Sequence, residues 1–338
     1  MGESDRLLTL LSPEMGLLRL IAPGARKPNA KLGGRSGLFV VNDLLVAQGK
    51  SLHRISQAET LESYPGLARD LAKLTAGQYL AEIVLHQALT EQPQADLYYL
   101  FTEHLSRIAT AEPEQILPAL SQAVYQLLAL GGLAPQVQQC SISNAVLEPN
   151  LEAMEDAQVG FSIEGGGVIS LPALHEQLKA LETSRAEFQA GKLEAEDFAL
   201  VREAIGEYRV MTIAQLPRYR RQRHSEKSAP QTMLLIDAIE LYLMQQLAQE
   251  TLPQVSDNAG YSGEALHTAW RRIERILRQY AQYHCDRPIR SASLIDSLFY
   301  CLFPYLMWVI DCVWGARPRA PTGAIGINRR ARPIRLFE

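Results

Sequence analysis

The sequence predicts an α+β protein in which a small β-barrel precedes a mainly α-helical domain. Short apolar runs separated by turn residues fill the first 63 positions, and apolar residues recur at steps of three and four after them. The 338 residues are 47% hydrophobic and 21% charged, which is ordinary for a folded globular chain. We expect three parts, over residues 1–63, 64–298 and 299–338.

The first part alternates short strands and turns. Its apolar runs are LLTLL, LLRLIA, LFVVNDLLVA and LHRISQAETL, and clusters such as SPEMG, PGARKPNAKLGG and QGKS separate them. Short strands of such even spacing are typical of a small closed or partly open β-barrel. We therefore expect a barrel over residues 1–63.

Helical periodicity begins beyond Pro65, where Leu67, Leu71 and Leu74 start a series of three- and four-residue steps. Residues 66–132 are predicted to form a helical bundle, and the glycines at 131 and 132 supply a left-handed helix stop. The later helices of the bundle and of the rest of the chain are predicted over about residues 96–109, 113–130, 232–249 and 263–284.

Two segments interrupt this helical domain. Residues 140–172 are rich in turn residues and predict an irregular loop or small β element that projects from the surface. Residues 173–230 form a charged insertion, helical from His175 to Tyr208 as one broken helix or two. A basic, proline-flanked linker follows, with Arg218, Arg220, Arg221, Arg223 and Lys227.

The net charge of −4 argues against a uniformly basic nucleic-acid binder, so any electrostatic argument depends on local patches. The start MGESDRLLTL has no pattern of a secretory signal, which favours a cytoplasmic location. In that reducing compartment the cysteines are expected as thiols. They are Cys140, Cys285, Cys301 and Cys312.

Motifs of catalysis are incomplete. Leu44 stands where a phosphate-binding loop needs its first glycine, and Glu264 stands where a nucleophile elbow needs its last. Lys179 occupies the position of the second histidine of a zinc-protease helix beginning at His175. We therefore expect a binding protein, not an enzyme, that uses no cofactor, although a site assembled from distant residues stays open.

Basic residues gather on or beside the turns of the first part. A small barrel with such a cluster can follow a phosphate backbone by counterion release, and Phe39 offers a stacking surface for bases. A solvated basic loop is the alternative interpretation. The candidate DNA-binding residues are Arg19, Arg26, Lys27, Lys31, Arg35, Lys50 and Arg54.

The predicted helix over residues 263–284 carries arginines on one face and apolar side chains on the opposite face. Such a charged face is ordinary on a packed helix, so contact with DNA or a partner is one of two interpretations. The candidate secondary contacts, including those of the linker, are Arg218, Arg220, Arg221, Arg271, Arg275 and Arg278.

Several segments resemble the bacterial recombination mediator family RecO. They are GESDRLLTLLSPEMGLLRLIAPGARKP, AETLESYPGLARDL, YLAEIVLHQAL, LLALGGLAPQVQQC, VGFSIEGGGVIS and RRIERILRQYAQYHCDRPIRSASLID, spread over about residues 2–298. GESDRLLTL, GARKP and GLAP taken in order are far more specific than any one of them.

The resemblance implies an N-terminal OB-fold, a helical domain and a DNA-repair protein without an active site. Members bind single- and double-stranded DNA and anneal strands coated with single-strand-binding protein. With the partner RecR they help to load the recombinase RecA. Carried over by motif, the phosphate contacts are Arg26, Lys27, Lys31 and Arg35.

The sequence departs from the family in two places. Many members hold zinc with two CxxC pairs. In this sequence Cys140 is the first cysteine of the first pair, but Ser143 stands at the position of the second cysteine, and Ile169 and its neighbours replace the second pair. A four-thiolate site therefore cannot form, and we expect no metal. The family also has a strand before GESDRLL, and Met1 stands alone in its place, which leaves the expected barrel without its first strand.

The segment from 299 to the end resembles nothing in the family. Its apolar run from Leu298 to Trp314 is at the short limit of a membrane span and contains Pro304 and Asp311. A membrane helix, a buried or interfacial helix and a non-native extension are the open alternatives. The competing hypothesis is thus a helical scaffold or membrane-associated protein that works through this tail.

Overall fold

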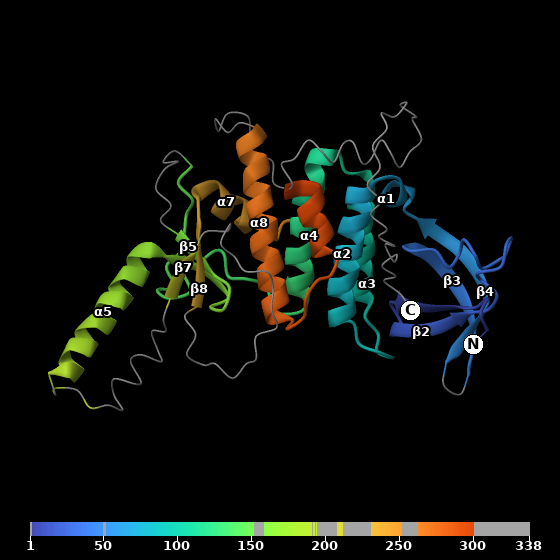
Figure 1. Cartoon of the computed structure of the whole chain (residues 1–338), viewed down its shortest axis with the longest axis horizontal. Helices are drawn as coiled ribbons and strands as arrows, with labels where there is room; N and C mark the ends of the chain where they lie inside the picture. Colours follow the sequence, from blue (N-terminus) through green and yellow to red (C-terminus); the bar gives the residue numbers. More distant parts are fainter. Residues whose placement is uncertain are drawn as a thin grey trace, which may run out of the picture. The chain divides into compact units, whose positions relative to one another are not determined.

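The computed structural model describes residues 2–49, 52–151, 159–190, 192, 194, 208–211, 231–251 and 263–300. These residues form two compact units (Figure 1). The first holds the described residues among 2–10, 19–63 and 293–300, and the second holds 11–18 and the described residues from 64 to 292. The tail beyond residue 300 lies outside the described residues, so its predictions stay predictions.

The N-terminal sheet contains four strands in the order β1-β2-β4-β3, one for each predicted apolar run. Burial alternates along the second half of β2. Leu20 and Ala22 are buried, whereas Arg19, which points to the opposite side of the sheet, is exposed. Among the described strands β1 and β3 are edges, so the sheet is open and not a closed barrel. The strands are β1 (Arg6–Ser12), β2 (Gly16–Ala22), β3 (Val40–Ala47) and β4 (His53–Ser63).

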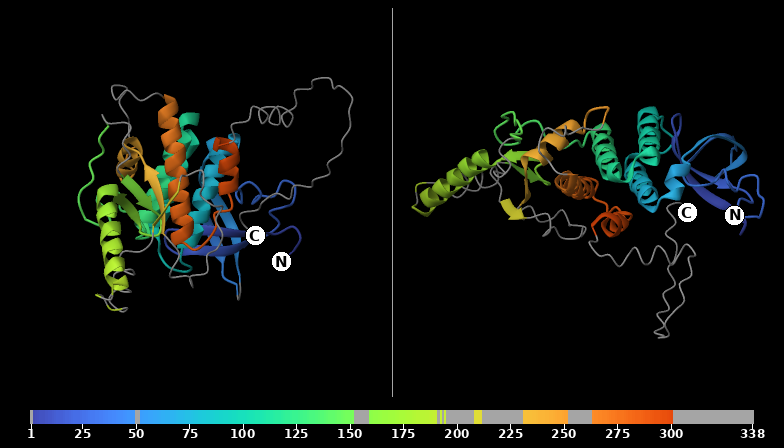
Figure 2. Two further views of the ribbon diagram at one scale, coloured as in Figure 1. Left: turned by 60° about the vertical axis from the view of Figure 1, so that its left-hand side comes forward. Right: turned by 90° about the horizontal axis from the view of Figure 1, so that it is seen from above.

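A helical bundle forms most of the second unit, as predicted, with α2, α3, α4 and α8 side by side (Figures 1 and 2). The Asp70 carboxylate caps α2 by accepting the Ala72 N–H at 2.7 Å. After α4 the chain turns at Gly132, whose φ of +73° is left-handed. The elements of the bundle are α1 (Pro65–Arg69), α2 (Leu71–Gln87), α3 (Ala95–Thr110), a 3₁₀ turn (Pro113–Gln115), α4 (Ile116–Leu130) and α8 (Gly263–His284). Further along the chain come α9 (Ala292–Ile295) and a π-helical turn (Asp296–Tyr300).

A second sheet lies beside this bundle in the same unit, with the strand order β6-β5-β8-β7. β8 is antiparallel to β5 and parallel to β7, so strands from both sides of the charged insertion meet in it. The strands are β5 (Val159–Ser162), β6 (Gly167–Ser170), β7 (Tyr208–Met211) and β8 (Gln231–Ile236).

The predicted helix over 232–249 is wrong in its first part. Residues 231–236 form β8, and helix α7 (Ala238–Gln246) begins only after Asp237. A short apolar run is compatible with a buried strand or a helix, and period alone does not separate them. The helix start is marked by a capping box, in which Asp237 and Glu240 each accept the other's backbone N–H.

The prediction of a surface projection over 140–172 is wrong for residues 159–170, which lie in a sheet, whereas residues 141–150 are irregular and mostly exposed, as predicted. Cys140, Phe161 and Val168 are all fully buried. The predicted alternative of a small β element is confirmed here, since β5 and β6 form a hairpin that pairs with β8 and so lies inside a sheet. Helix α5 (Leu171–Gln189) follows and is largely exposed, with Leu174 as its buried residue. Residues 195–207 of the predicted charged helix lie outside the described part.

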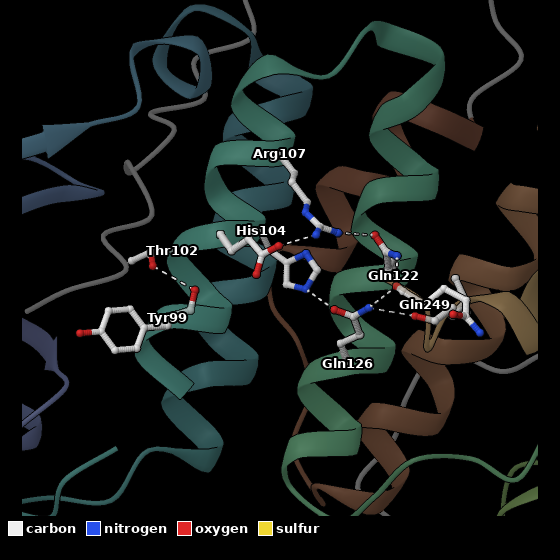
Figure 3. Close-up of polar contacts among 9 residues, drawn as sticks. Tyr99, Thr102, His104, Arg107, Gln122, Gln126 and Gln249 are labelled. Atoms are coloured by element: carbon white, nitrogen blue, oxygen red, sulfur yellow. Dashed lines mark hydrogen bonds and ion pairs between the residues drawn. The ribbon is translucent and has the colours of Figure 1, made fainter. Parts of the chain in front are cut away.

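Polar side chains connect α3 and α4 with the turn after α7 (Figure 3). His104 Nε2 lies 3.0 Å from Gln126 Oε1, and the Gln126 amide donates to the Leu247 and Gln249 carbonyls. Gln122 also donates to Gln249, at 2.7 Å, and accepts from Arg107. Because the side chains of His104, Gln122 and Gln126 are buried or half-buried, their bonds fix the position of the turn on the bundle.

None of the helices in the described ranges is long and apolar enough to cross a membrane.

Candidate nucleic-acid interface

The basic turn, which we define as residues 24–37, carries four of the predicted DNA-binding residues. All four side chains are exposed. Successive reverse turns shape it: for example, the Lys27 N–H donates to the Gly24 carbonyl at 3.0 Å, and the Gly33 N–H donates to the Ala30 carbonyl at 2.9 Å. The exposed cations are Arg26, Lys27, Lys31 and Arg35.

Residues just before and at the start of β1 anchor the first end of the basic turn. Asp5 Oδ1 accepts the Gly24 N–H at 2.9 Å, and the Ser4 carbonyl accepts the Arg26 N–H at 2.9 Å. The bonds from Gly24 and then Gly2 lower the pKa of the Asp5 carboxyl, and the charge of Arg54 adds to them. The carboxylate is therefore ionised near neutral pH and holds the turn.

Arg6 anchors the other end. Its guanidinium donates to the Ser36 carbonyl at 3.0 Å and to the Ser36 hydroxyl at 2.9 Å, and the Asn42 amide donates to the Arg35 carbonyl at 2.9 Å. Arg35 Nη1 also reaches the Lys31 carbonyl, at 3.5 Å. The turn is thus held at both ends by side chains of the sheet, while its cations point to solvent.

Two further predicted residues, Arg19 and Arg54, share one face of the sheet. Ile21 pairs with Arg54 in the parallel ladder of β2 and β4, and paired residues point to the same side. Arg19 lies two residues from Ile21 and so on that same side. Arg54 also lies within electrostatic reach of Asp5, which brings this face to the anchored end of the basic turn.

The far half of the β3–β4 ribbon is acidic. Asp43 pairs with Glu59, Val41 pairs with Glu62, and all three carboxylates are exposed. Such a stretch repels a phosphate backbone. Charges on the first unit are therefore segregated, with the cations at the basic turn and on one face of the sheet.

The two other candidates in the first part of the chain are Phe39, which the structure describes, and Lys50, which it does not. Phe39 is half-buried and has a left-handed φ of +56° just before β3. Lys50 lies outside the described residues. Among the secondary candidates, Arg218, Arg220 and Arg221 lie outside them as well, together with Arg223 and Lys227 of the linker.

On α8, the structure separates the three candidate arginines. Arg271 and Arg275 are half-buried, but Arg278 is 4% exposed, donates to the Ala292 carbonyl at 3.0 Å and pairs with Glu274 at 3.3 Å. The prediction of a surface role for Arg278 is wrong. Helical period places it in line with Arg271, but the chain after α8 returns to Arg278 at Ala292, which the pattern of one helix does not reveal.

The loop at Cys140, which corresponds to the zinc loop of the family, contains one buried thiol among apolar side chains. Cys140 Sγ accepts the N–H groups of Ser143 at 3.5 Å and Ser170 at 3.3 Å. Burial raises the pKa of this thiol, but these hydrogen bonds outweigh burial and lower the pKa overall. The buried cluster around it consists of Cys140, Ile169, Leu174 and Met233.

These residues do not fit a zinc ion, because one thiol among apolar side chains offers too few ligands. The described residues hold no group of three or more histidine, cysteine, aspartate or glutamate side chains placed to bind a metal. Whether the whole chain binds metal stays a prediction. In the loop itself, apolar packing takes the place that coordination has in zinc-containing relatives.

Sequence patterns missed the anchors of the basic turn. Asp5 and Arg6 lie in the GESDRLLTL motif, but their partners Gly24 and Ser36 are far along the chain and no period connects them. The sequence offers one weak signal of this anchor: an aspartate stands directly before a strand, and a glycine-containing turn follows later in the chain.

Family comparisons agree with this architecture. The model described as "Recombination protein O N terminal" matches residues 1–64, and "Recombination protein O C terminal" matches residues 68–210. The chain is therefore a recombination protein of the class that joins a small N-terminal β domain to a helical domain.

Similar proteins named "DNA repair protein RecO" occur in Nostoc punctiforme, Gloeothece citriformis and Trichodesmium erythraeum. They are 45%, 44% and 40% identical, over 88%, 88% and 90% of this chain and 92%, 93% and 93% of their own lengths. The chain belongs to the RecO family of DNA repair proteins.

Proposed function

We propose that the protein acts in recombinational repair by binding DNA without catalysis, with the basic turn as its main phosphate contact. It anneals single strands coated with single-strand-binding protein and helps RecR to load RecA. The family supports the repair role. The anchored basic turn, with its four exposed cations, is the observation that carries the DNA-binding part.

The anchoring matters for affinity. A mobile basic loop loses conformational freedom when it binds, at about 1–2 kcal/mol per ordered residue. Bonds from Asp5 and Arg6 to the turn reduce that loss before DNA arrives. Arg19 and Arg54 extend the cationic surface along one face of the sheet, and the acidic half of β3–β4 limits it.

The proposal is tested by fluorescence anisotropy with a labelled single-stranded oligonucleotide over a salt series. Charge reversal of Arg26 and Lys27 is expected to weaken binding equally for all base sequences. The slope of log affinity against log salt should fall by about 0.7 for each lost contact. The matched control reverses Arg185, an exposed arginine on α5.

An unchanged affinity in the Arg26 and Lys27 variant would overturn the assignment to the basic turn. Failure of the folded wild-type chain to bind would overturn DNA binding itself. A strand-annealing assay with coated strands, with and without RecR, separates the mediator role from simple binding.

A further inference from the structure

One side of the β3–β4 ribbon carries three carboxylates and an exposed leucine. Asp43 and Leu45 are two residues apart on β3 and therefore point to the same side, and Glu59 pairs with Asp43 across the ladder. Val41, two residues before Asp43, pairs with Glu62, which extends this side. We call Asp43, Leu45, Glu59 and Glu62 the acidic face.

The charges of the acidic face are not compensated by other described residues. Asp43 and Glu59 lie directly opposite each other, and like charges in that arrangement destabilise a β ladder. All three carboxylates are exposed, and none forms an ion pair with a residue in the described ranges. Leu45 is 59% exposed, and Leu61, at the β-bulge beside Glu62, is 67% exposed. The face therefore offers both anions and apolar surface to a partner.

The basic turn, residues 24–37, is bonded to the opposite side of the same ribbon. The Asn42 amide donates to the Arg35 carbonyl at 2.9 Å, and Thr60, which pairs with Asn42, donates to Asn42 Oδ1 at 3.1 Å. Neighbouring residues of a strand point to opposite sides, so Asp43 points away from the side on which Asn42 holds the turn. The four exposed cations of the turn likewise form no ion pair with the residues that the structure describes.

The charges of the acidic face decide which partner fits it. DNA does not fit, because carboxylates repel phosphates. Two acidic faces packed against each other would repel as well. A protein surface that carries cations fits, and the basic turn of a second copy is such a surface. Because the turn and the acidic face belong to opposite sides of one ribbon, this contact is heterologous and leads from one chain to the next.

We propose that the acidic face of one chain binds the basic turn of a second copy, and that DNA competes with this contact for the same cations. The self-association is argued from the charges and the geometry of the first unit. The competition rests on the proposed function. Exposed charges and two leucines form the contact, so it is weak and is screened by salt. The chain thus covers its own DNA-binding turn until a strand displaces the second copy.

Analytical ultracentrifugation of the full chain tests the self-association without DNA. Near 0.03 M salt the average number of chains per particle should rise with protein concentration, and at about 0.5 M salt it should return to one. D43K/E59K should weaken the association at least about tenfold, since like charges then meet. E176K/E182K makes the same change of charge at exposed positions of α5, and this control should behave as wild type.

A mixture of two variants tests whether these two surfaces bind each other. R26E/K27E retains the acidic face, and D43K/E59K retains the basic turn, so each variant alone should associate weakly while an equal mixture should regain association. K179E/R185E on α5 is the control for the first variant. If D43K/E59K does not retain the wild-type Tm, D43N/E59Q replaces it, because amides remove the charges with almost the same shape.

The contact is overturned if wild type stays monomeric at low salt, or if the mixture associates no more than its two components. It is also overturned if D43K/E59K associates as strongly as E176K/E182K.

A short single strand of about ten nucleotides tests the competition. At low salt it should return wild type to single chains. Wild type that binds the strand and stays associated would overturn the shared use of the cations. Failure of the proposed function is distinguishable, because a chain that does not bind the strand still self-associates in the ultracentrifuge.

Discussion

The Glu240 carboxyl group is completely buried and lies within ion-pair distance of Arg272, whose side chain is 39% exposed. Arg272 also donates to the Leu235 carbonyl at 3.0 Å, which joins α8 to β8. Glu240 is thus fully desolvated, whereas Arg272 remains partly solvated. The pair is therefore expected to be sensitive to pH through Glu240.

Stability should decline at alkaline pH because of Glu240. Burial, and then Asp237, raise the pKa of this carboxyl to about 8, against which Arg272 acts. The folded state therefore holds the proton more tightly than the unfolded state. Its stabilising contribution is present below about pH 4.5 and is lost as pH rises through 8. Glu240→Gln retains the capping acceptor and removes the charge.

Denaturant unfolding of wild type and E240Q between pH 5 and 9 checks this. As pH rises, the free energy of unfolding of E240Q should increase relative to that of wild type by on the order of 2 kcal/mol. E176Q, at an exposed position on α5, is the control and should follow wild type. A constant difference between E240Q and wild type over this range would contradict the prediction.

His104 should make the fold sensitive to mild acid. Burial, and then the charge of Arg107, lower its pKa to about 4. The unfolded state takes up a proton near pH 6.5 while the folded state resists, so stability falls as pH drops from about 6.5 to 4. His104→Gln should flatten this dependence by on the order of 2 kcal/mol. Urea unfolding at pH 7.5, 5.5 and 4.5 measures it, with exposed His175→Gln as control; equal pH profiles for H104Q and wild type would rule it out.

Gly16 should not tolerate a side chain. Its φ is +63°, and an added Cβ would lie 2.3 Å from the Leu89 carbonyl oxygen and 2.4 Å from that of Gln92. Both backbone strain and a clash with backbone atoms follow, so Gly16→Ala should cost about 2 kcal/mol or more. Gly34, where an added Cβ meets nothing within 4 Å, supplies the control. Similar melting temperatures for the two alanine variants would show that the loop over 89–92 moves aside.

Metal removal should leave the fold unchanged, because the Cys140 thiol accepts hydrogen bonds inside an apolar cluster. Incubation with a chelator is expected to leave Tm at its starting value. Cys140→Ala should lower stability by about 1–2 kcal/mol, through the lost packing and the unsatisfied N–H groups of Ser143 and Ser170. A lower Tm after chelation, together with metal in the purified protein, would contradict this account.

Local patterns predicted much of the fold. The period of α8 was strong over six turns, and its predicted bounds of 263–284 are those of the structure. The strands of the first sheet coincide with the apolar runs because a half-buried strand alternates. β8 was missed because its run is too short for its period to decide.

The candidate site was predicted less completely. Basic residues of one turn are neighbours in sequence, so their clustering could be read directly. The bonds from Asp5 to Gly24 and from Glu82 to Arg290 join residues far apart in the chain, and only folding brings them together. The same applies to the burial of Arg278, which depends on a segment beyond its own helix.

The strand order β6-β5-β8-β7 also constrains how the protein can be made. Val159 pairs with Ile236, so the hairpin of β5 and β6 leaves the ribosome well before the strand that lies between β5 and β7. At about 5–20 residues per second, the buried face of that hairpin waits for several seconds without its neighbour. Synthesis of residues 231–236 is thus the moment when the nascent second sheet stops being a target for chaperones and for aggregation.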